Sequence, residues 1–208
     1  MARAMSVTTA VRKKYKKLKW SEEWQAAFDN PQMDGIWCVW GNSGSGKTSF
    51  LLELCKELSR FGRVVYNSLE EYDRDTFQQA LLRHNIASFS RRILITKENA
   101  VEMVERMSKQ KAPYAIVMDS VQYLQWRLKN YFDFKEKMKG KLVIVVSHAE
   151  GKKPEGRVAD KIKYDADLKI WIEGYRAISQ GRYIGKNGGV FTIWEEGANI
   201  YWGKKNDN

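Results

Sequence analysis

Several residue types and patterns that define other classes of protein are scarce or missing in this chain of 208 residues. It has only two cysteines, Cys38 and Cys55, which offer neither a disulfide framework nor a metal-binding spacing and are best interpreted as small core residues. No apolar run is long enough to span a bilayer, and the basic N-terminus lacks the apolar stretch of a secretion signal. We therefore expect a cytoplasmic protein that does not use a membrane.

Acidic residues are missing from the first 19 positions, although the whole chain carries a formal charge of +11. This arm contributes +7 to that charge, through Arg3, Arg12, Lys13, Lys14, Lys16, Lys17 and Lys19. Blocks of like charge often serve as interaction tails, so the arm predicts a polyanionic partner such as nucleic acid. The alternative is a solvated tail that only aids solubility.

The rest of the chain alternates between strand-like and helix-like segments. Hydrophobic residues make up 43% of the sequence, which is enough for one globular domain with a core. Short apolar runs predict strands at 36–40, 64–68, 93–95, 114–118 and 142–146. Because helical spacing fills the intervals between them, we expect a mainly parallel sheet with helices on both faces.

The two ends of the chain differ from this pattern. Strand-like stretches at 167–172, 175–184 and 190–194 are joined by glycine turns, which predicts an antiparallel extension of the sheet. Near the start, Ser21 is a candidate cap for a short helix that ends at Asn30-Pro31. We therefore divide the chain into a basic arm with a short helix over residues 1–34 and an α/β domain over 35–208.

One segment matches the phosphate-binding pattern G-x-x-x-x-G-K-[ST] at every position. It consists of Gly41, Asn42, Ser43, Gly44, Ser45, Gly46, Lys47 and Thr48, with Ser49 following in the first helical turn. Backbone N–H groups of such a loop surround a β-phosphate, Lys47 reaches the β/γ oxygens and the Thr48 hydroxyl ligates Mg²⁺. A glycine turn without nucleotide is the alternative, but the strand before and the helix after the segment favour binding of Mg·ATP.

Polar residues at the ends of three other strands complete a candidate site. Asp119 ends the fourth strand, where an aspartate holds Mg²⁺ next to Thr48, although it could also cap a turn. The next residue is serine rather than the glutamate that many such ATPases use to activate water. Glu70, just past the second strand, is the best candidate for that role, with Glu71 as the second choice; plain surface acids are the alternative.

His148 follows the fifth strand directly. A polar residue there, beside the strand of Asp119, is able to touch the γ-phosphate and report its loss. A purely structural histidine is the alternative.

These motifs together resemble the RecA-like ATPases, especially DnaB-type ring helicases and RadA-type recombination ATPases. The shared sequences are Gly-Asn-Ser-Gly-Ser-Gly-Lys-Thr at 41–48, Ser-Leu-Glu at 68–70, Met-Asp-Ser-Val-Gln-Tyr-Leu at 118–124, Ser-His at 147–148, Tyr-Asp-Ala-Asp-Leu at 164–168 and Lys-Asn-Gly-Gly at 186–189. The resemblance covers about residues 35–194, an ATPase core alone, and such a core resembles small phage or mobile-element members.

The resemblance implies roles for individual residues. Glu70 would activate water, and His148 would be the phosphate sensor, a position that is usually glutamine but histidine in some phage ring helicases. A basic residue before the C-terminal hairpin would reach the ATP of a neighbouring subunit; Lys186 is the nearest match and Arg182 the second choice. Ile184 stands where the lysine of the usual Lys-x-Arg pair would be. A finger supplied by a neighbour implies a homo-oligomeric ring or filament.

A cationic segment at 150–161 supplies the candidate nucleic-acid contacts. Its glycines and proline predict a mobile loop. In RecA-like proteins the loop at this place grips single-stranded DNA, so the basic residues here are candidate contacts, namely Lys152, Lys153, Arg157 and Lys161. The alternative is a charged surface loop without a ligand.

The function that we expect is ATP hydrolysis coupled to movement on, or remodelling of, single-stranded DNA in replication or recombination. Two alternatives remain open. A slowly hydrolysing nucleotide switch would load or regulate another protein, and the incomplete finger favours it. A P-loop kinase would also bind ATP, but the sequence lacks an arginine-rich lid, and Ser-Leu-Glu has no role in a kinase.

Overall fold

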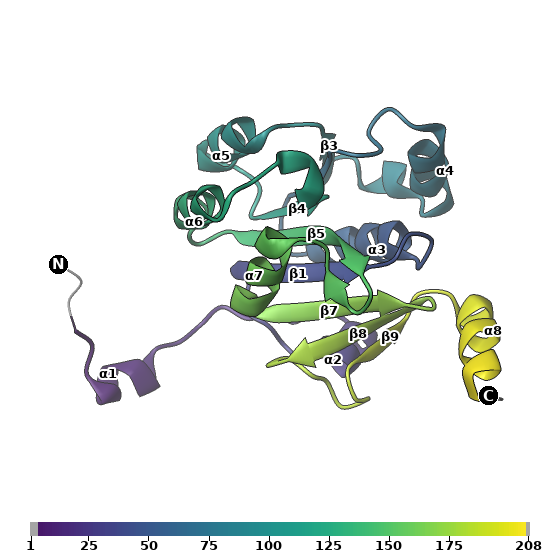
Figure 1. The fold of residues 1–208 in the computed structure, drawn as a ribbon. Helices are drawn as coiled ribbons and strands as arrows, with labels where there is room; N and C mark the ends of the chain where they lie inside the picture. Colours follow the sequence, from purple (N-terminus) through teal and green to yellow (C-terminus); the bar gives the residue numbers. More distant parts are fainter. Residues whose placement is uncertain (1–3, 207–208) are drawn as a thin grey trace.

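The computed structural model describes residues 4–206, so Arg3 lies outside the described residues (Figure 1). A central sheet has the strand order β3-β2-β4-β5-β1-β7-β8-β9, and β6 pairs only with β5. The strands from β3 to β7 in that order are parallel, whereas β8 and β9 are antiparallel. Their bounds are β1 Gly35–Gly41, β2 Val64–Ser68, β3 Ile93–Thr96, β4 Ala115–Asp119, β5 Leu142–Glu150, β6 Lys153–Pro154, β7 Leu168–Glu173, β8 Arg176–Gly181 and β9 Val190–Thr192.

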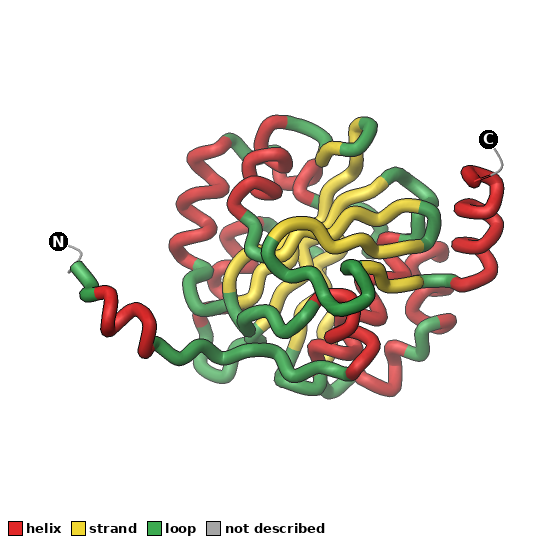
Figure 2. Tube along the Cα trace, turned by 90° about the horizontal axis from the view of Figure 1, so that it is seen from below, coloured by secondary structure: helices red, strands yellow, loops and turns green. Residues whose placement is uncertain are grey.

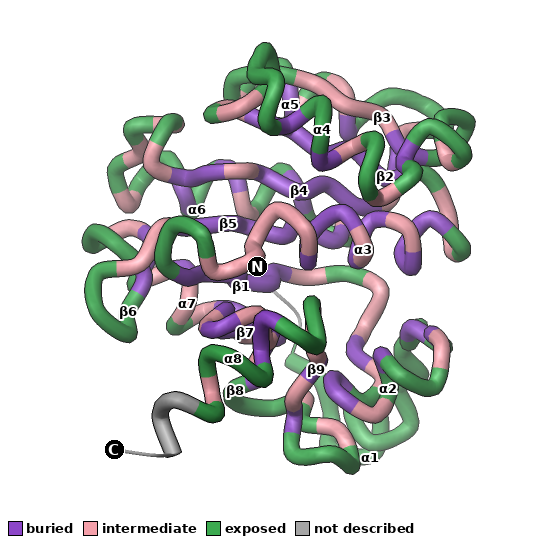
Figure 3. Tube along the Cα trace, turned by 90° about the vertical axis from the view of Figure 1, so that its right-hand side faces the viewer, coloured by how far each residue is buried: buried purple, intermediate pink, exposed green. Residues whose placement is uncertain are grey.

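Helices cover both faces of the sheet. Their bounds are α1 Val7–Arg12, α2 Glu22–Phe28, α3 Lys47–Ser59, α4 Asp75–Arg83, α5 Ala100–Ser108, α6 Leu128–Lys137, α7 Arg157–Asp165 and α8 Glu195–Asn206, with short 3-10 turns at Ile86–Phe89 and Val121–Leu124. Because side chains alternate along a strand, β1 sends Trp37 to the face of α2, α3 and α4 and Trp40 to the face of α5, α6 and α7. The central strands are therefore buried on both faces (Figure 3).

The predicted class is confirmed: the sheet is mainly parallel, with helices on both faces and an antiparallel C-terminal extension. The two cysteines are buried and unpaired, as expected, and burial raises the pKa of the Cys38 thiol to about 12. None of the helices within residues 4–206 is long and apolar enough to cross a membrane.

The prediction of a mobile loop at 150–161 is wrong. Strand β5 continues to Glu150 and pairs back with Lys153 and Pro154, so that a tight hairpin forms. Gly151 makes the turn and Gly156 precedes α7, with φ values of 61° and 86° that favour glycine. Helix α7 then buries Ala159 and Ile162 against the sheet. Their helical spacing was the signal for an ordered segment.

The tail and the N-terminal segment also differ from expectation. Helix α8 follows β9, beyond the last strand that was predicted at 190–194. Helix α2 forms as predicted, and its Trp24 packs on Phe191 of β9 with the ring centroids 4.4 Å apart. The backbone N–H of Gly185 donates to the carbonyl of Ala27 at 3.0 Å. Leu18, Trp20 and the buried face of α2 therefore belong to the core, while α1 buries no residue and extends away from the body (Figure 2).

Candidate nucleotide site

The strand order brings the predicted site residues together at one edge of the sheet. Strands β2, β4, β5 and β1 are parallel neighbours, so their carboxyl ends meet at the place where α/β proteins bind ligands. Gly41 pairs with His148 across β1 and β5, and Ser68 pairs with Asp119 across β2 and β4. A cleft of about 650 Å³ opens there, lined by Ser43, Gly44, Gly46, Lys47, Thr48, Ser49, Glu70, Glu71, Arg83, Asp119, His148, Ala149, Glu155 and Tyr175.

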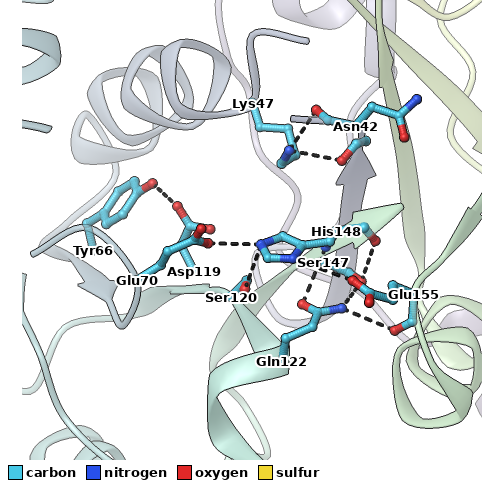
Figure 4. A network of polar contacts seen from close by, with 11 residues as sticks. Asn42, Lys47, Tyr66, Glu70, Asp119, Ser120, Gln122, Ser147, His148 and Glu155 are labelled. Carbon is cyan, nitrogen blue, oxygen red and sulfur yellow. Dashed lines mark hydrogen bonds and ion pairs between the residues drawn. The ribbon is translucent and has the colours of Figure 1, made fainter. Parts of the chain in front are cut away.

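The glycine-rich loop connects β1 to α3 at this cleft. At Gly41 a Cβ atom would lie 2.4 Å from the carbonyl oxygen of Ile172, so only glycine fits. Gly46 has a φ of 100° and directly precedes α3, which allows the chain to turn sharply into the helix. The Lys47 ammonium donates to the carbonyls of Gly41 and Asn42, both at 2.9 Å (Figure 4). It is therefore held over the loop whose N–H groups would surround a phosphate.

Burial and the neighbouring charges shift the pKa of Lys47 in opposite directions. Burial lowers the pKa of the Lys47 ammonium, whereas the carboxylates of Asp119, Glu70 and Glu71 raise it. Asp119 is half-buried, and the loss of hydration raises the pKa of its carboxyl to about 6, while a hydrogen bond donated by the Tyr66 hydroxyl opposes that rise. With Arg83 and Glu155, the cleft lining thus contains two cations and four carboxylates, so an entering phosphate chain would need a metal ion to offset the negative charge.

Thr48 and Asp119 have the donor atoms that a magnesium ion requires. Both line the cleft, one with a hydroxyl and the other with a carboxylate, and Mg²⁺ prefers oxygen ligands and keeps several waters when it is bound with phosphates. The peptide bond between Asp119 and Ser120 is cis. These residues fit Mg²⁺ held mainly by the nucleotide, whose phosphate charge the ion would neutralise.

His148 lies between two carboxylates. Its Nε2 is 2.9 Å from Glu70 Oε2 and 3.4 Å from the hydroxyl oxygen of Ser120, and its Nδ1 is 3.5 Å from Glu155 Oε2. The ring of Tyr123 meets the imidazole edge-on at 6.3 Å between centroids. Glu70 comes from the loop after β2, and Glu155 follows β6. The hairpin that β5 forms with β6 carries Lys152 and Lys153, and we call it the cationic hairpin. The His148 imidazole therefore bridges the cleft and this hairpin (Figure 4).

Gln122 forms a second connection between the end of β5 and the hairpin. Its amide oxygen accepts from the backbone N–H of His148 at 3.3 Å, and its Nε2 donates to Ser147 Oγ at 2.8 Å and to the carbonyl of Glu155 at 3.1 Å. The end of β5 and the hairpin are therefore fixed to one side chain.

The candidate finger residues lie far from this cleft within the chain. Strand β8 runs antiparallel to β7 and pairs Gly181 with Leu168, at the edge of the sheet opposite the glycine-rich loop. Arg182 lies 3.6 Å from Asp167 there, and Lys186 forms an ion pair of 3.0 Å with Glu22. Neither residue is positioned to serve the phosphate loop of its own chain.

The four cationic residues at 150–161 divide into two groups. Lys152, Lys153 and Arg157 are exposed, and within the described part of the chain none of the three forms an ion pair. Lys161 lies on α7 and pairs with Asp165 at 3.0 Å.

Sequence reasoning missed three polar or aromatic side chains that line the cleft. Glu155 contacts His148, Arg83 comes from the last turn of α4, and Tyr175 lies in the turn between β7 and β8. The backbone N–H of Tyr175 donates to the carbonyl of Ser45 at 3.3 Å, so this turn supports the glycine-rich loop. The Gly174-Tyr175 turn was visible in the sequence, but its contact with the loop depends on β7 lying next to β1.

Comparisons with known proteins agree with this fold. No protein-family model matches the sequence, and no curated protein matches it. The solved flagellar accessory protein FlaH from Methanocaldococcus jannaschii has a TM-score of 0.58 and 16% identity, over 84% of this chain and 91% of that chain. A KaiC-like protein from Pyrococcus horikoshii OT3 has a TM-score of 0.61 and 18% identity, over 86% of this chain and 99% of that chain. Both have the RecA-like fold of P-loop ATPases, which is therefore the fold of this chain.

Replacement of Lys47 by alanine tests the site. We expect Lys47→Ala to abolish ATP binding with little change in thermal stability, because the ammonium contacts only loop carbonyls and the phosphate space. Titration with a fluorescent ATP analogue and a thermal melt measure the two effects. Lys56→Ala is the control, because Lys56 lies on the same helix but pairs with Glu53 outside the cleft. Unchanged affinity in Lys47→Ala would contradict the assignment.

Two neighbouring carboxylates are distinguished by isosteric substitution. Glu70→Gln should retain ATP affinity and lose about two to four orders of magnitude in turnover, because an amide does not accept the proton of the attacking water. Glu71→Gln, which also removes a charge from the cleft, is the matched control and should have a smaller effect. Phosphate release under saturating ATP measures both. A larger effect in Glu71→Gln would show that the second choice is the base.

Proposed function

We propose that this chain is an ATPase, with ADP and phosphate as products, whose hydrolysis is coupled to binding of single-stranded DNA during replication or recombination. Such a protein would be a helicase, a translocase or a recombinase-type ATPase. The observation that carries the proposal is the position of His148, with Glu70 of the cleft on one side and Glu155 of the cationic hairpin on the other.

The side chains of the cleft support hydrolysis of a nucleoside triphosphate. Lys47 would hold the β- and γ-phosphates, and Thr48 and Asp119 would hold Mg²⁺, which lowers the negative charge that the attacking water meets. Glu70 would accept the proton of that water. Because His148 shares the Glu70 carboxylate, loss of the γ-phosphate would change the balance between Glu70 and Glu155 as partners of the imidazole.

The hairpin supports a polyanionic partner. Lys152 and Lys153 are exposed on the hairpin that β5 forms with β6, and β5 also carries His148. A phosphate backbone bound there would act on the cleft through an element of one continuous strand and through Gln122. The basic arm, which is exposed from residue 4 to 17, would add sequence-independent affinity.

The positions of the two finger candidates support the proposal of an oligomer. Arg182 and Lys186 lie at the edge of the sheet opposite the glycine-rich loop, so they would reach a γ-phosphate only in another subunit. Head-to-tail association of that kind generates a ring or a filament.

A nucleotide switch with slow turnover is the second candidate. It is favoured by the ion pairs that Lys186 and Arg182 make within their own chain, with Glu22 and Asp167. Both pairs are exposed and therefore weak, so a neighbouring phosphate would compete with them effectively.

The hairpin tests the partner. Replacing Lys152, Lys153 and Arg157 with alanine should weaken binding of single-stranded DNA and reduce the log–log salt slope by roughly 0.7 for each phosphate that the variant no longer neutralises. Basal hydrolysis should persist, because none of the three lines the cleft, but stimulation by DNA should disappear.

Deletion of residues 1–14, which precede the buried Leu18, should weaken DNA binding, but the DNA that is bound should still stimulate hydrolysis. Normal DNA binding by the triple variant, together with no binding by the arm deletion, would favour the switch.

Mixing of variants tests the oligomer. If Arg182 or Lys186 acts on a neighbour, turnover per subunit should rise with protein concentration. Subunits with Arg182→Ala and Lys186→Ala should regain activity when mixed with Lys47→Ala subunits, because one supplies the cleft and the other the finger. Lys47→Ala mixed with Glu70→Gln is the control, since both damage the cleft. A monomer whose turnover is independent of concentration would exclude a ring or filament.

A further inference from the structure

Two aromatic rings are exposed side by side with lysines on α6 and α7. Tyr164 at the end of α7 is 77% exposed, and Phe132 on α6 is 46% exposed. The Lys161 ammonium lies 4.9 Å from the Tyr164 ring and 5.8 Å from the Phe132 ring, and that of Lys169 lies 6.0 Å from the Tyr164 ring. Exposed rings beside cations offer a face on which a nucleic-acid base can stack while the cations meet its phosphates.

The lysines of this surface repel one another. Burial lowers the pKa of the Lys163 ammonium, and the charges of Lys169 and Lys153 lower it further, so the three lie within electrostatic range. Asp160 is the acidic side chain that offsets this repulsion at Lys163. Asp165, the other carboxylate of α7, is already shared by Lys135 and Lys161. The surface therefore carries positive charge that its own acids do not neutralise.

The surface is continuous with the cationic hairpin. The Lys163 ammonium lies 4.2 Å from the centre of the Trp40 ring, and the Trp40 indole N–H donates to the carbonyl of Lys152 at 3.2 Å. A ligand that follows the positive charge from the hairpin along α7 would therefore meet Lys163 first and Tyr164 next.

We propose that single-stranded nucleic acid crosses this surface, with one base stacked on Tyr164 and the flanking phosphates against Lys163 and Lys169. Alternating cations and exposed rings suit a strand whose bases are free, because a base face stacks on an aromatic ring while the phosphates need cations. A duplex hides its base faces, and an acidic peptide would use the lysines without the rings. The proposal rests on the single-stranded partner proposed above and adds a second part to its binding surface.

Substitution of Tyr164 tests the stacking. Tyr164→Ala should weaken binding of a labelled 20-residue oligothymidylate about tenfold, as expected when one base is no longer stacked, and should leave the salt slope unchanged. Tyr164→Phe keeps the ring and should bind normally. Fluorescence anisotropy measures the affinity. Basal ATP hydrolysis should be unaffected in both variants, because Tyr164 precedes β7 at the edge of the sheet opposite the cleft.

Substitution of the lysines tests the phosphate contacts. The pair Lys163→Gln and Lys169→Gln should lower the log–log salt slope by about 1.4, corresponding to two phosphates that are no longer neutralised. Lys109→Gln with Lys139→Gln removes the same charge from exposed positions after α5 and α6 and should leave the slope unchanged. Thermal melts of all variants show whether weaker binding reflects unfolding; Tyr164→Phe remains informative if a lysine variant does not fold.

The outcomes distinguish a failure of this surface proposal from a failure of the proposed function on which it rests. If the hairpin variant fails to bind DNA while the Tyr164 and lysine variants bind normally, the surface proposal is wrong and the proposed function stands. If no variant changes binding, or if none of the proteins binds DNA, both fail. If Tyr164→Ala binds normally and the lysine pair weakens binding of heparin as much as that of oligothymidylate, the surface is a general anion site, and stacking is excluded.

Discussion

The parallel pairing of β2, β4, β5 and β1 is the constraint on which the site depends. Residues distant in sequence meet because each follows the carboxyl end of a neighbouring strand, and the pairing of Gly41 with His148 sets how the loop faces that histidine. A shift of one residue between β1 and β5 would send buried side chains to the wrong face. Core packing on the two faces of β1 thus fixes the geometry of the cleft.

The antiparallel extension is held by a second set of contacts, which involves α2, the helix that precedes β1 in the sequence. Trp24 of α2 packs against Phe50 of α3 and Phe191 of β9, which joins the N-terminal helix, the helix of the glycine-rich loop and the last strand. The largely buried Glu57 accepts from the backbone N–H of Ser21 at 2.6 Å and binds Arg60, so its charge is satisfied. Through this cluster the start of the chain supports the edge that carries Arg182 and Lys186.

Sequence predicted the parts of the site that local pattern determines. The glycine-rich loop and Asp119 each follow an apolar strand, and the RecA-like core they indicated is the fold observed. Arg83 and Tyr175 were missed because their approach to the cleft depends on where α4 ends and on the pairing of β7 with β1. The hairpin was missed because its glycines were interpreted as flexibility, whereas their positive φ angles allow a tight turn and the entry into α7.

The path from hairpin to cleft is short because β5 belongs to both. A strand in the middle of a parallel sheet does not slide easily, since its hydrogen bonds and buried side chains are fixed on both sides. In the function proposed above, a ligand bound at the hairpin would therefore act through side chains, and His148 contacts Glu70 as well as Glu155. Coupling would then consist of a change in which carboxylate, Glu70 or Glu155, the His148 imidazole contacts more closely, and this change needs only a small movement of the ring. Gln122 limits that movement by holding the backbone of His148 in place.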